Sequence, residues 1–443
     1  AIGAIAVGAT STFCICWFGT GNDFGNLVPF ARTSAAVISG YSAAMSIEDP
    51  TRRYDYWLAA LVVVLIAGFA VVHGRGLARR SGIGIGLVAL VVVWFLFKEG
   101  FVRHDIHDLI FFAVAPLILV ALTPWPRSWL VVPVLLVLTG VTATVAGGFP
   151  FFVTRPDAAV RNFSSEAATL ASSARTAAVI HHSRRSLRDS YAIPNRMLAM
   201  MAGQTVDVSP WEPTVAWAYP QLRFDPLPVI TDYNAYTSSL DQLDTNYLVA
   251  PDSPRFILRK FEALDGRDPA FEPPNTQLAI ECRYRQVVGG ASWQLLERGA
   301  DRCGAMQPLG TVTTGFDDWA SVPTAAAGDV VVARFQLTLG WWFKLESVLY
   351  KPPAISLDYR YGGRNQSWRF VAGTAPDLHV IQAASTLGYD NKFVPLAPRR
   401  LMFSIEGGSQ SSTGVRVSFY RIHEVAVPTD NAHAFAQTAH EVP

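Results

Sequence analysis

The feature that most constrains the fold is a set of long, almost uncharged apolar segments in the first third of the chain. Residues 1–18 carry no charged side chain. Four further apolar stretches follow, at Tyr56–His73, Ile83–Phe97, Ile106–Thr123 and Trp129–Gly147. Apolar runs approaching about 20 residues are typical of helices that cross a lipid bilayer. The sequence therefore predicts an integral-membrane α-helical bundle of about five spans over residues 1–149, and we expect further spans to precede Ala1.

The distribution of arginine predicts an orientation. Three arginines lie in the loop Gly74–Ser81, and basic loops are typically cytoplasmic. Alternation then places everything after Gly148 outside, so we expect a bacterial inner (plasma) membrane protein with extracytoplasmic C-terminal domains in contact with membrane lipid. The formal net charge of +1 over 443 residues argues against a nucleic-acid partner, which would require a basic surface.

Two exported domains follow. Residues 150–305 combine a long helix, Ser164–Tyr191, with alternating helical and strand patterns, which predicts a small α/β domain. Residues 306–428 read as strands with two-residue periodicity separated by turns, which predicts an antiparallel, jelly-roll-like β-sandwich, and residues 429–443 read as a flexible tail. Cys282 and Cys303 either form one disulfide in an oxidising compartment or remain unpaired buried thiols.

The densest polar cluster is KEGFVRHDIHD, from Lys98 to Asp108. In one interpretation Asp105 or Asp108 is a general base toward a hydroxyl, while Lys98 and Arg103 hold a phosphate.

Two other interpretations of this cluster stay open. Ligands to a divalent cation could come from His104, Asp105, His107 and Asp108. Alternatively the segment is an interfacial loop that pairs its own charges. If the segment is helical, His104 and Asp108 share one face.

Three further groups are weaker candidates for binding. Asp23, in the loop 19–55, could face the same cavity as the Lys98–Asp108 segment or belong to a structural cap. A helix end rich in arginine could bind a lipid phosphate or be a solvated face, and it holds Arg184, Arg185 and Arg188. Aromatic and acidic residues in Val206–Asp241 could bind a sugar or form a domain seam, the main ones being Trp211, Glu212, Asp232 and Tyr236. The chain has no GxxxxGK[ST], HExxH, CxxC or GxSxG pattern, so ATP-driven and Rossmann-type chemistry have no support.

The strings KEGFVRHDIHD, SGYSAAM and VDVSPWE are similar to those of uncharacterised bacterial polytopic membrane proteins. The overall plan resembles bacterial envelope glycosyltransferases of the GT-C type, including arabinosyltransferases with carbohydrate-binding sandwiches. The resemblance implies a polyprenyl-phosphate sugar donor, a glycan acceptor and an aspartate base in an external loop. That class has nine or more spans, whereas five are counted here.

Three functional hypotheses follow from these observations. The first is a cell-envelope glycosyltransferase or polysaccharide-assembly enzyme that uses a polyprenyl-phosphate sugar, with Asp105 or Asp108 as its base. The second is a non-enzymatic, membrane-anchored glycan-binding or scaffold subunit that contacts other membrane subunits. The third is an enzyme similar to O-antigen ligases or polymerases, in which external His and Arg side chains act.

Overall fold

The computed structural model describes residues 2–74, 79–122, 156–290, 292–324, 326, 328–361, 364–383, 387, 398–406 and 414–424, with isolated positions between 123 and 155. The N-terminal part is helical, with one short parallel strand pair between β1 and β2. Its elements are α1 (Ile2–Gly19), η1 (Phe24–Asn26), α2 (Leu27–Met45), β1 (Ile47–Glu48), η2 (Pro50–Arg52), α3 (Tyr54–Gly74), α4 (Arg79–Val102), β2 (Arg103–His104) and α5 (Asp108–Leu122).

The membrane-spanning bundle predicted from the sequence is wrong for the part of the chain that the structure describes. No helix there combines the length and the apolar character needed to cross a membrane. Helix α5 has 15 residues where about 20 are needed. Helix α4 includes two arginines in its first turn and a Lys-Glu pair near its end. The described chain is instead a mixed structure of helices and several sheets.

The predicted location in a bacterial inner membrane, with extracytoplasmic C-terminal domains, is corrected by the same finding. It depended on counting membrane spans and on the arginine asymmetry between their loops. The fifth expected span, Trp129–Gly147, falls mostly outside the described residues, as does the expected tail 429–443.

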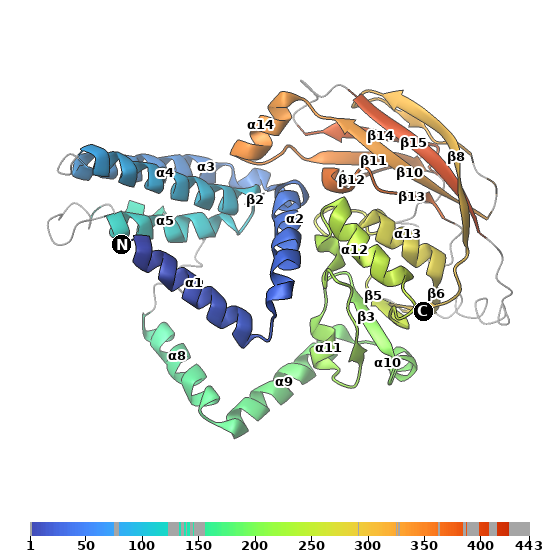
Figure 1. The fold of residues 1–443 in the computed structure, drawn as a ribbon, viewed down its shortest axis with the longest axis horizontal. Coiled ribbons are helices and arrows are strands. Elements are labelled where there is room, and N and C mark those ends of the chain that lie inside the picture. The colour runs from blue at the N-terminus through green and yellow to red at the C-terminus, as the bar shows by residue number, and fades with distance from the viewer. Residues whose placement is uncertain are drawn as a thin grey trace.

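An α/β domain follows two helices that form a V in Figure 1. The predicted single helix over Ser164–Tyr191 is divided into two, because the Ser172 hydroxyl accepts a hydrogen bond from the Arg175 amide and starts a new helix. The helices of this part are α8 (Pro156–Leu170), α9 (Ser173–Tyr191), α10 (Asn195–Met201), α11 (Thr214–Ala218), η3 (Asp232–Asn234), α12 (Ser238–Val249) and α13 (Pro274–Arg283).

Within the described residues, the sheet of this domain has the strand order β4-β3-β5-β7-β6. Strands β3, β4 and β5 are parallel, and β6 and β7 form an antiparallel hairpin at one edge. Their bounds are β3 (Thr205–Ser209), β4 (Arg223–Phe224), β5 (Phe256–Arg259), β6 (Tyr284–Gly289) and β7 (Gln294–Arg298). Apolar side chains from alternate positions of β3 and β5 fill a cluster on one face of this sheet, and Ile257 of β5 belongs to a cluster on the other face.

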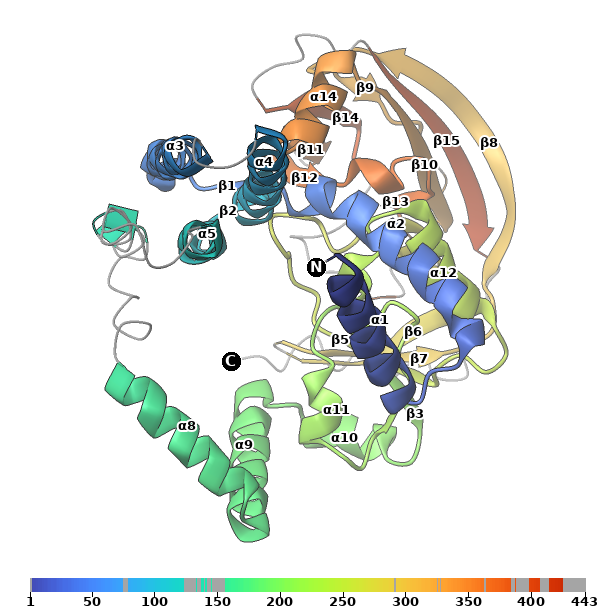
Figure 2. The same ribbon diagram turned by 60° about the vertical axis from the view of Figure 1, so that its left-hand side comes forward.

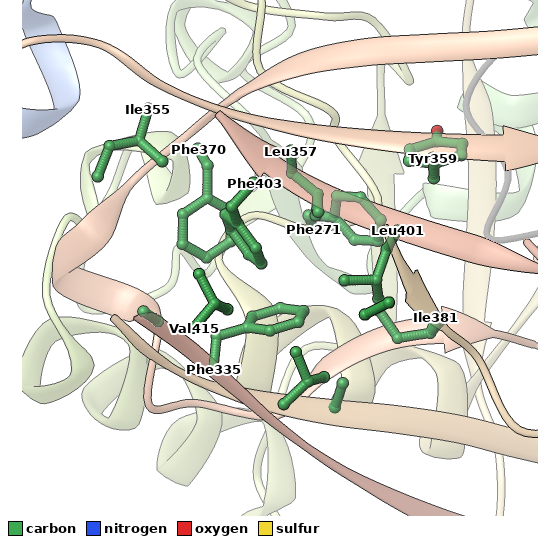
Figure 3. Packing of buried hydrophobic residues seen from close by; sticks show 14 of the residues in the cluster. Phe271, Phe335, Ile355, Leu357, Tyr359, Phe370, Ile381, Leu401, Phe403 and Val415 are labelled. Atoms are coloured by element: carbon green, nitrogen blue, oxygen red, sulfur yellow. The ribbon is translucent and has the colours of Figure 1, made fainter. Parts of the chain in front are cut away.

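The C-terminal part is a β-sandwich of two antiparallel sheets. In the described residues their strand orders are β13-β10-β15-β8 and β12-β11-β14-β9. Phe335, Phe370 and Phe403 meet edge to face between the sheets (Figure 3). The elements are β8 (Cys303–Thr314), β9 (Ala320–Ser321), β10 (Asp329–Thr338), α14 (Trp341–Leu349), β11 (Ile355–Tyr361), β12 (Arg364–Phe370), η4 (Ala372–Thr374), β13 (His379–Gln382), β14 (Arg400–Ile405) and β15 (Gly414–Glu424).

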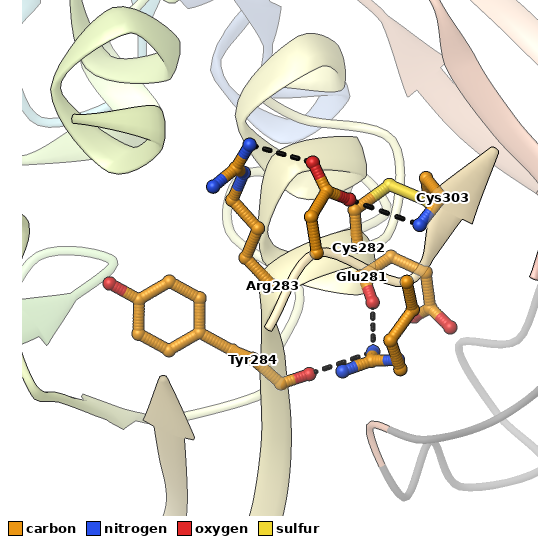
Figure 4. Close-up of a disulfide and its surroundings, with 7 residues drawn as sticks. Glu281, Cys282, Arg283, Tyr284 and Cys303 are labelled. Atoms are coloured by element: carbon orange, nitrogen blue, oxygen red, sulfur yellow. Dashed lines mark hydrogen bonds and ion pairs between the residues drawn. A yellow bond between two sulfur atoms is a disulfide. The ribbon is translucent and has the colours of Figure 1, made fainter. Parts of the chain in front are cut away.

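Figures 1 and 2 show the three parts around a shared junction, with α2 lying between the N-terminal helices and α12. Gly40 on α2 lies so close to Tyr236 that an added Cβ would come within 2.5 Å of the tyrosine Cβ. A disulfide joins Cys282 at the end of α13 to Cys303 at the start of β8, so it links the α/β domain directly to the sandwich (Figure 4).

Candidate functional site

The Lys98–Asp108 segment forms a strand and a turn rather than a continuous helix. Helix α4 ends at Val102, and β2 then pairs in parallel with β1. The helix stops because the Asp105 carboxylate binds Arg103 Nε at 2.9 Å and the His107 amide at 3.0 Å, which fixes a turn before α5. His107 Nδ1 also contacts Asp105, at 2.5 Å.

The basic residues of this segment contact the two C-terminal parts of the chain. Arg103 forms a two-pronged pair with Asp265 at 2.8 and 2.9 Å. The Lys98 ammonium donates to the carbonyl oxygens of Ser347 and Val348 at the end of α14, each at 2.9 Å. Burial lowers the pKa of Lys98, and the carboxylate of Asp265 helps to raise the pKa of Arg103. Lys98 and Arg103 therefore connect this segment to α14 and to Asp265 of the α/β domain.

A second set of contacts connects β1 to the sandwich. The Glu48 carboxylate accepts hydrogen bonds from Lys351 Nζ at 2.5 Å and from the Tyr56 hydroxyl at 2.8 Å, and it contacts His104 Nδ1 at 2.9 Å. Burial opposes ionisation of Glu48, but these hydrogen bonds hold its pKa below the ordinary value. Arg369 on β12 adds a bond to the Ala44 carbonyl at 2.8 Å.

A buried acidic cluster lies directly beside the contacts of Glu48. Asp55, His104 and Asp108 are each 0% exposed. His104 Nε2 lies 3.9 Å from Asp55 Oδ2 and 3.9 Å from Asp108 Oδ2. Arg52 donates to both oxygens of Asp108 and lies 3.0 Å from Asp55 Oδ2. Burial and the adjacent Asp55 raise the pKa of Asp108 to about 7, although Arg52 opposes the rise.

Two open hollows meet at Arg334 on β10. The first, of about 360 Å³, lies between α12, α13 and β10, and its polar lining includes Gln242, Asn275 and Asp377. The second, of about 480 Å³, lies along β10 and β15. We call the two hollows together the Arg334 groove.

The second hollow is lined by side chains that alternate with those of the sandwich core. Phe335 points into the core, so its neighbour Arg334 faces outward, and the same alternation on β15 places Arg416, Ser418 and Tyr420 beside it. The Arg334 guanidinium lies 6.0 Å from the centre of the Tyr420 ring. Polar, charged and aromatic groups thus line the two hollows, which share Arg334.

The other residues singled out from the sequence are spread over several elements. Asp232 is buried and accepts a hydrogen bond from the Ser209 hydroxyl at 2.5 Å, and burial raises its pKa to about 7. Tyr236 is buried in contact with α2. Trp211 donates to Glu262 at 3.1 Å, and Glu212 pairs with Lys260 at 3.1 Å. The adjacent cavity has about 30 Å³, which is room for one water molecule rather than a sugar.

The arginines of α9 pack on α11. Arg184 and Arg188 lie over the rings of Trp217 and Tyr219 and donate to backbone carbonyls, while Arg185 is exposed. The Asp23 side chain is exposed before η1. The structure does not bring these residues together with the Lys98–Asp108 segment.

Sequence reasoning missed four residues that define the two sites: Arg52 and Asp55 in the buried cluster, and Arg334 and Asp377 in the groove. No local signal distinguished Asp55, because an acidic residue in the first turn of a helix is common. For Arg334 the only signal was an arginine that follows the apolar run VVVA in the strand DVVVARFQLT. Comparison with protein-family models, characterised proteins and solved structures finds no match.

Proposed function

We propose that the chain is a non-enzymatic glycan-binding scaffold, in which the Arg334 groove binds a linear glycan across the α/β domain and the sandwich. The observation that carries the proposal is that two hollows of about 360 and 480 Å³ share Arg334 as a lining residue. Their combined size suits an extended polar chain better than a small metabolite.

The chemistry of the lining supports a glycan. A sugar ring presents an apolar C–H face and a rim of hydroxyl groups. Tyr420 offers an aromatic face, and Arg334, Gln336 and Arg416 offer donors. Asp377 and Asn275 line the first hollow and give it a polar wall.

The scaffold role is supported by the ion pairs and hydrogen bonds of the Lys98–Asp108 segment. Residues that sugar transfer would need as base or phosphate ligand are engaged within the chain: Arg103 with Asp265, Lys98 with α14, and Asp105 with Arg103 and His107. These contacts hold the helical part, the α/β domain and the sandwich together. Transfer from a polyprenyl-phosphate sugar, and ligase- or polymerase-like chemistry, stay predictions without support from this geometry.

The experiment is isothermal titration of the full chain with neutral linear arabinan and galactan hexasaccharides. We expect binding of at least one, and a loss of at least tenfold in affinity in Arg334→Ala and in Tyr420→Ala. Arg421→Ala is the matched control. Arg421 is an exposed arginine on β15, the strand of Tyr420, and its side chain binds Gln307 outside the groove. Equal affinity in Arg334→Ala and the control would refute the proposal.

A further inference from the structure

The buried cluster of Asp55, His104 and Asp108 contains polar atoms that nothing in the described chain satisfies. Among the described residues, His104 Nε2 and Asp55 Oδ1 have no hydrogen-bond partner, while Asp55 Oδ2 lies 3.0 Å from Arg52 Nε. Buried polar groups in native proteins are almost always hydrogen-bonded, and each exception calls for an explanation. Here the exceptions are adjacent and face one another.

The contacts of His104 sharpen the problem. Its Nδ1 lies 2.9 Å from the Glu48 carboxylate, which can only accept, so Nδ1 carries the proton. His104 Nε2 lies 3.9 Å from one oxygen of each aspartate, a distance too long for a direct hydrogen bond. These three ligand atoms therefore enclose a position that a cation can occupy.

We propose that Asp55, His104 and Asp108 bind a divalent transition-metal cation, with Zn²⁺ as the best fit. One ligand atom from each of the three residues lies within 4.8 Å of the other two. Ligands bound to one Zn²⁺ at about 2.0–2.2 Å lie about 3 to 4 Å apart, so 3.9 Å is close to the required separation. An imidazole nitrogen among the ligands favours Zn²⁺ over Mg²⁺, Ca²⁺ or Mn²⁺.

The surroundings have the features of an outer coordination sphere. A carboxylate on the far nitrogen of a ligating histidine fixes the tautomer and strengthens the ligand, and Glu48 occupies that position. Arg52 holds the Asp108 carboxylate at 2.8 Å and 3.0 Å. Arg52 also pairs with Asp55, so it offsets part of the charge of the two carboxylates. Asp55 and Asp108 lie in the first turns of α3 and α5, where the helix dipole favours a carboxylate.

The position predicts what the metal would do. Its ligands come from α3, β2 and α5, and Glu48 reaches on to Lys351 next to the sandwich. A bound cation would therefore join the helices and stiffen the junction that carries the C-terminal parts. This inference is independent of the glycan proposal, since the cluster and the Arg334 groove share no residue.

The test uses the full chain stripped with EDTA and titrated separately with Zn²⁺, Mn²⁺ and Mg²⁺, with bound metal counted by mass spectrometry. We expect one Zn²⁺ per chain and a higher thermal midpoint on binding. His104→Gln and Asp55→Asn should each weaken Zn²⁺ binding at least 100-fold. Glu48→Gln should weaken it 10- to 100-fold, because an outer-sphere partner is lost.

The matched controls are His107→Gln and Glu99→Gln, which alter exposed side chains of the same segment. Both should bind Zn²⁺ like the parent chain. X-ray absorption at the zinc edge of the parent chain keeps the test valid if a variant fails to fold, and it should show only nitrogen and oxygen at about 2.0–2.2 Å. The proposal is overturned by no stoichiometric binding, by a sulfur shell, or by loss of binding in the controls alone.

Discussion

The α/β domain contains buried carboxyl groups, and Asp207 on β3 allows their effect on stability to be measured. Asp207 is 1% exposed. Its Oδ1 accepts from the Leu227 amide at 3.2 Å, and its Oδ2 has no partner among the described residues. Burial, with Asp232 as the second cause, raises the pKa of Asp207 to about 8. In the unfolded chain an aspartate has a pKa of about 3.9, so the folded state holds a proton that the unfolded state releases.

The sign of the pH dependence follows from this difference. Between about pH 4 and pH 8 the folded state binds more protons, so the free energy of unfolding falls by about 1.4 kcal/mol per pH unit for one such group. The stabilising contribution is complete below about pH 4 and is lost as the pH rises through about 8. Asp207→Asn is neutral at every pH and removes this slope. Relative to the parent chain, the variant should therefore gain about 3 kcal/mol between pH 5 and pH 7.

Urea denaturation followed by circular dichroism at pH 5, 6 and 7 measures this gain. Asp252→Asn is the control, because Asp252 is exposed in a turn near β5, and its effect should stay within about 0.5 kcal/mol at each pH. If the curves of Asp207→Asn and the parent chain run parallel with pH, Asp207 is ionised in the folded state and the reasoning fails.

Three further predictions concern the contacts between the parts of the chain. Arg103→Ala and Asp265→Ala, combined in a double-mutant cycle, should give a coupling energy of about 1–2 kcal/mol from urea denaturation, because the pair is two-pronged and mostly shielded; a value near zero would contradict this. The disulfide closes a loop with a sequence separation of 21, so its reduction should lower the free energy of unfolding by about 3 kcal/mol. Calorimetry with and without dithiothreitol measures this change, and an unchanged thermal midpoint would contradict it. Gly40→Ala should lower the free energy of unfolding by about 1–3 kcal/mol, because the added Cβ would collide with Tyr236. Gly86→Ala is the control, since its Cβ would meet nothing within 4 Å and should not destabilise the fold. Equal thermal midpoints for the two variants would count against the packing of α2.

Much of the secondary structure after residue 190 follows from local patterns. The alternation in Val415–Val425 predicts a half-buried strand, and β15 covers Gly414–Glu424. The Gly289-Gly290 turn predicts a hairpin, and β6 and β7 form it. The sequence pattern gave no sign of α14, because Trp341–Leu349 is a short helix between two strands and its apolar residues match either period.

The first third shows where such patterns fail. Hydropathy alone predicted membrane spans, but among the described residues no helix is both long enough and apolar enough to cross a membrane. For the Lys98–Asp108 segment, a helical interpretation placed His104 and Asp108 on one face. They do come close, but through a strand and a turn set by the Asp105 side chain.

The two sites depend on contacts between residues that are far apart in the chain. Asp55 joins His104 and Asp108 only because α3 packs beside α5 and β1 pairs with β2. Arg334 becomes the centre of a groove only because α13 packs against β13, the neighbour of β10 in its sheet. No local sequence pattern specifies these long-range contacts, which form only in the tertiary fold.

The most direct test of the glycan-binding account is a crystal structure of the full chain soaked with the hexasaccharide that binds most tightly. The account predicts sugar density along the Arg334 groove, with one ring stacked on Tyr420 and a hydroxyl within hydrogen-bond distance of Arg334 or Asp377. Density beside Trp211 and Glu212, or absence of density in the groove at a saturating concentration, would contradict it.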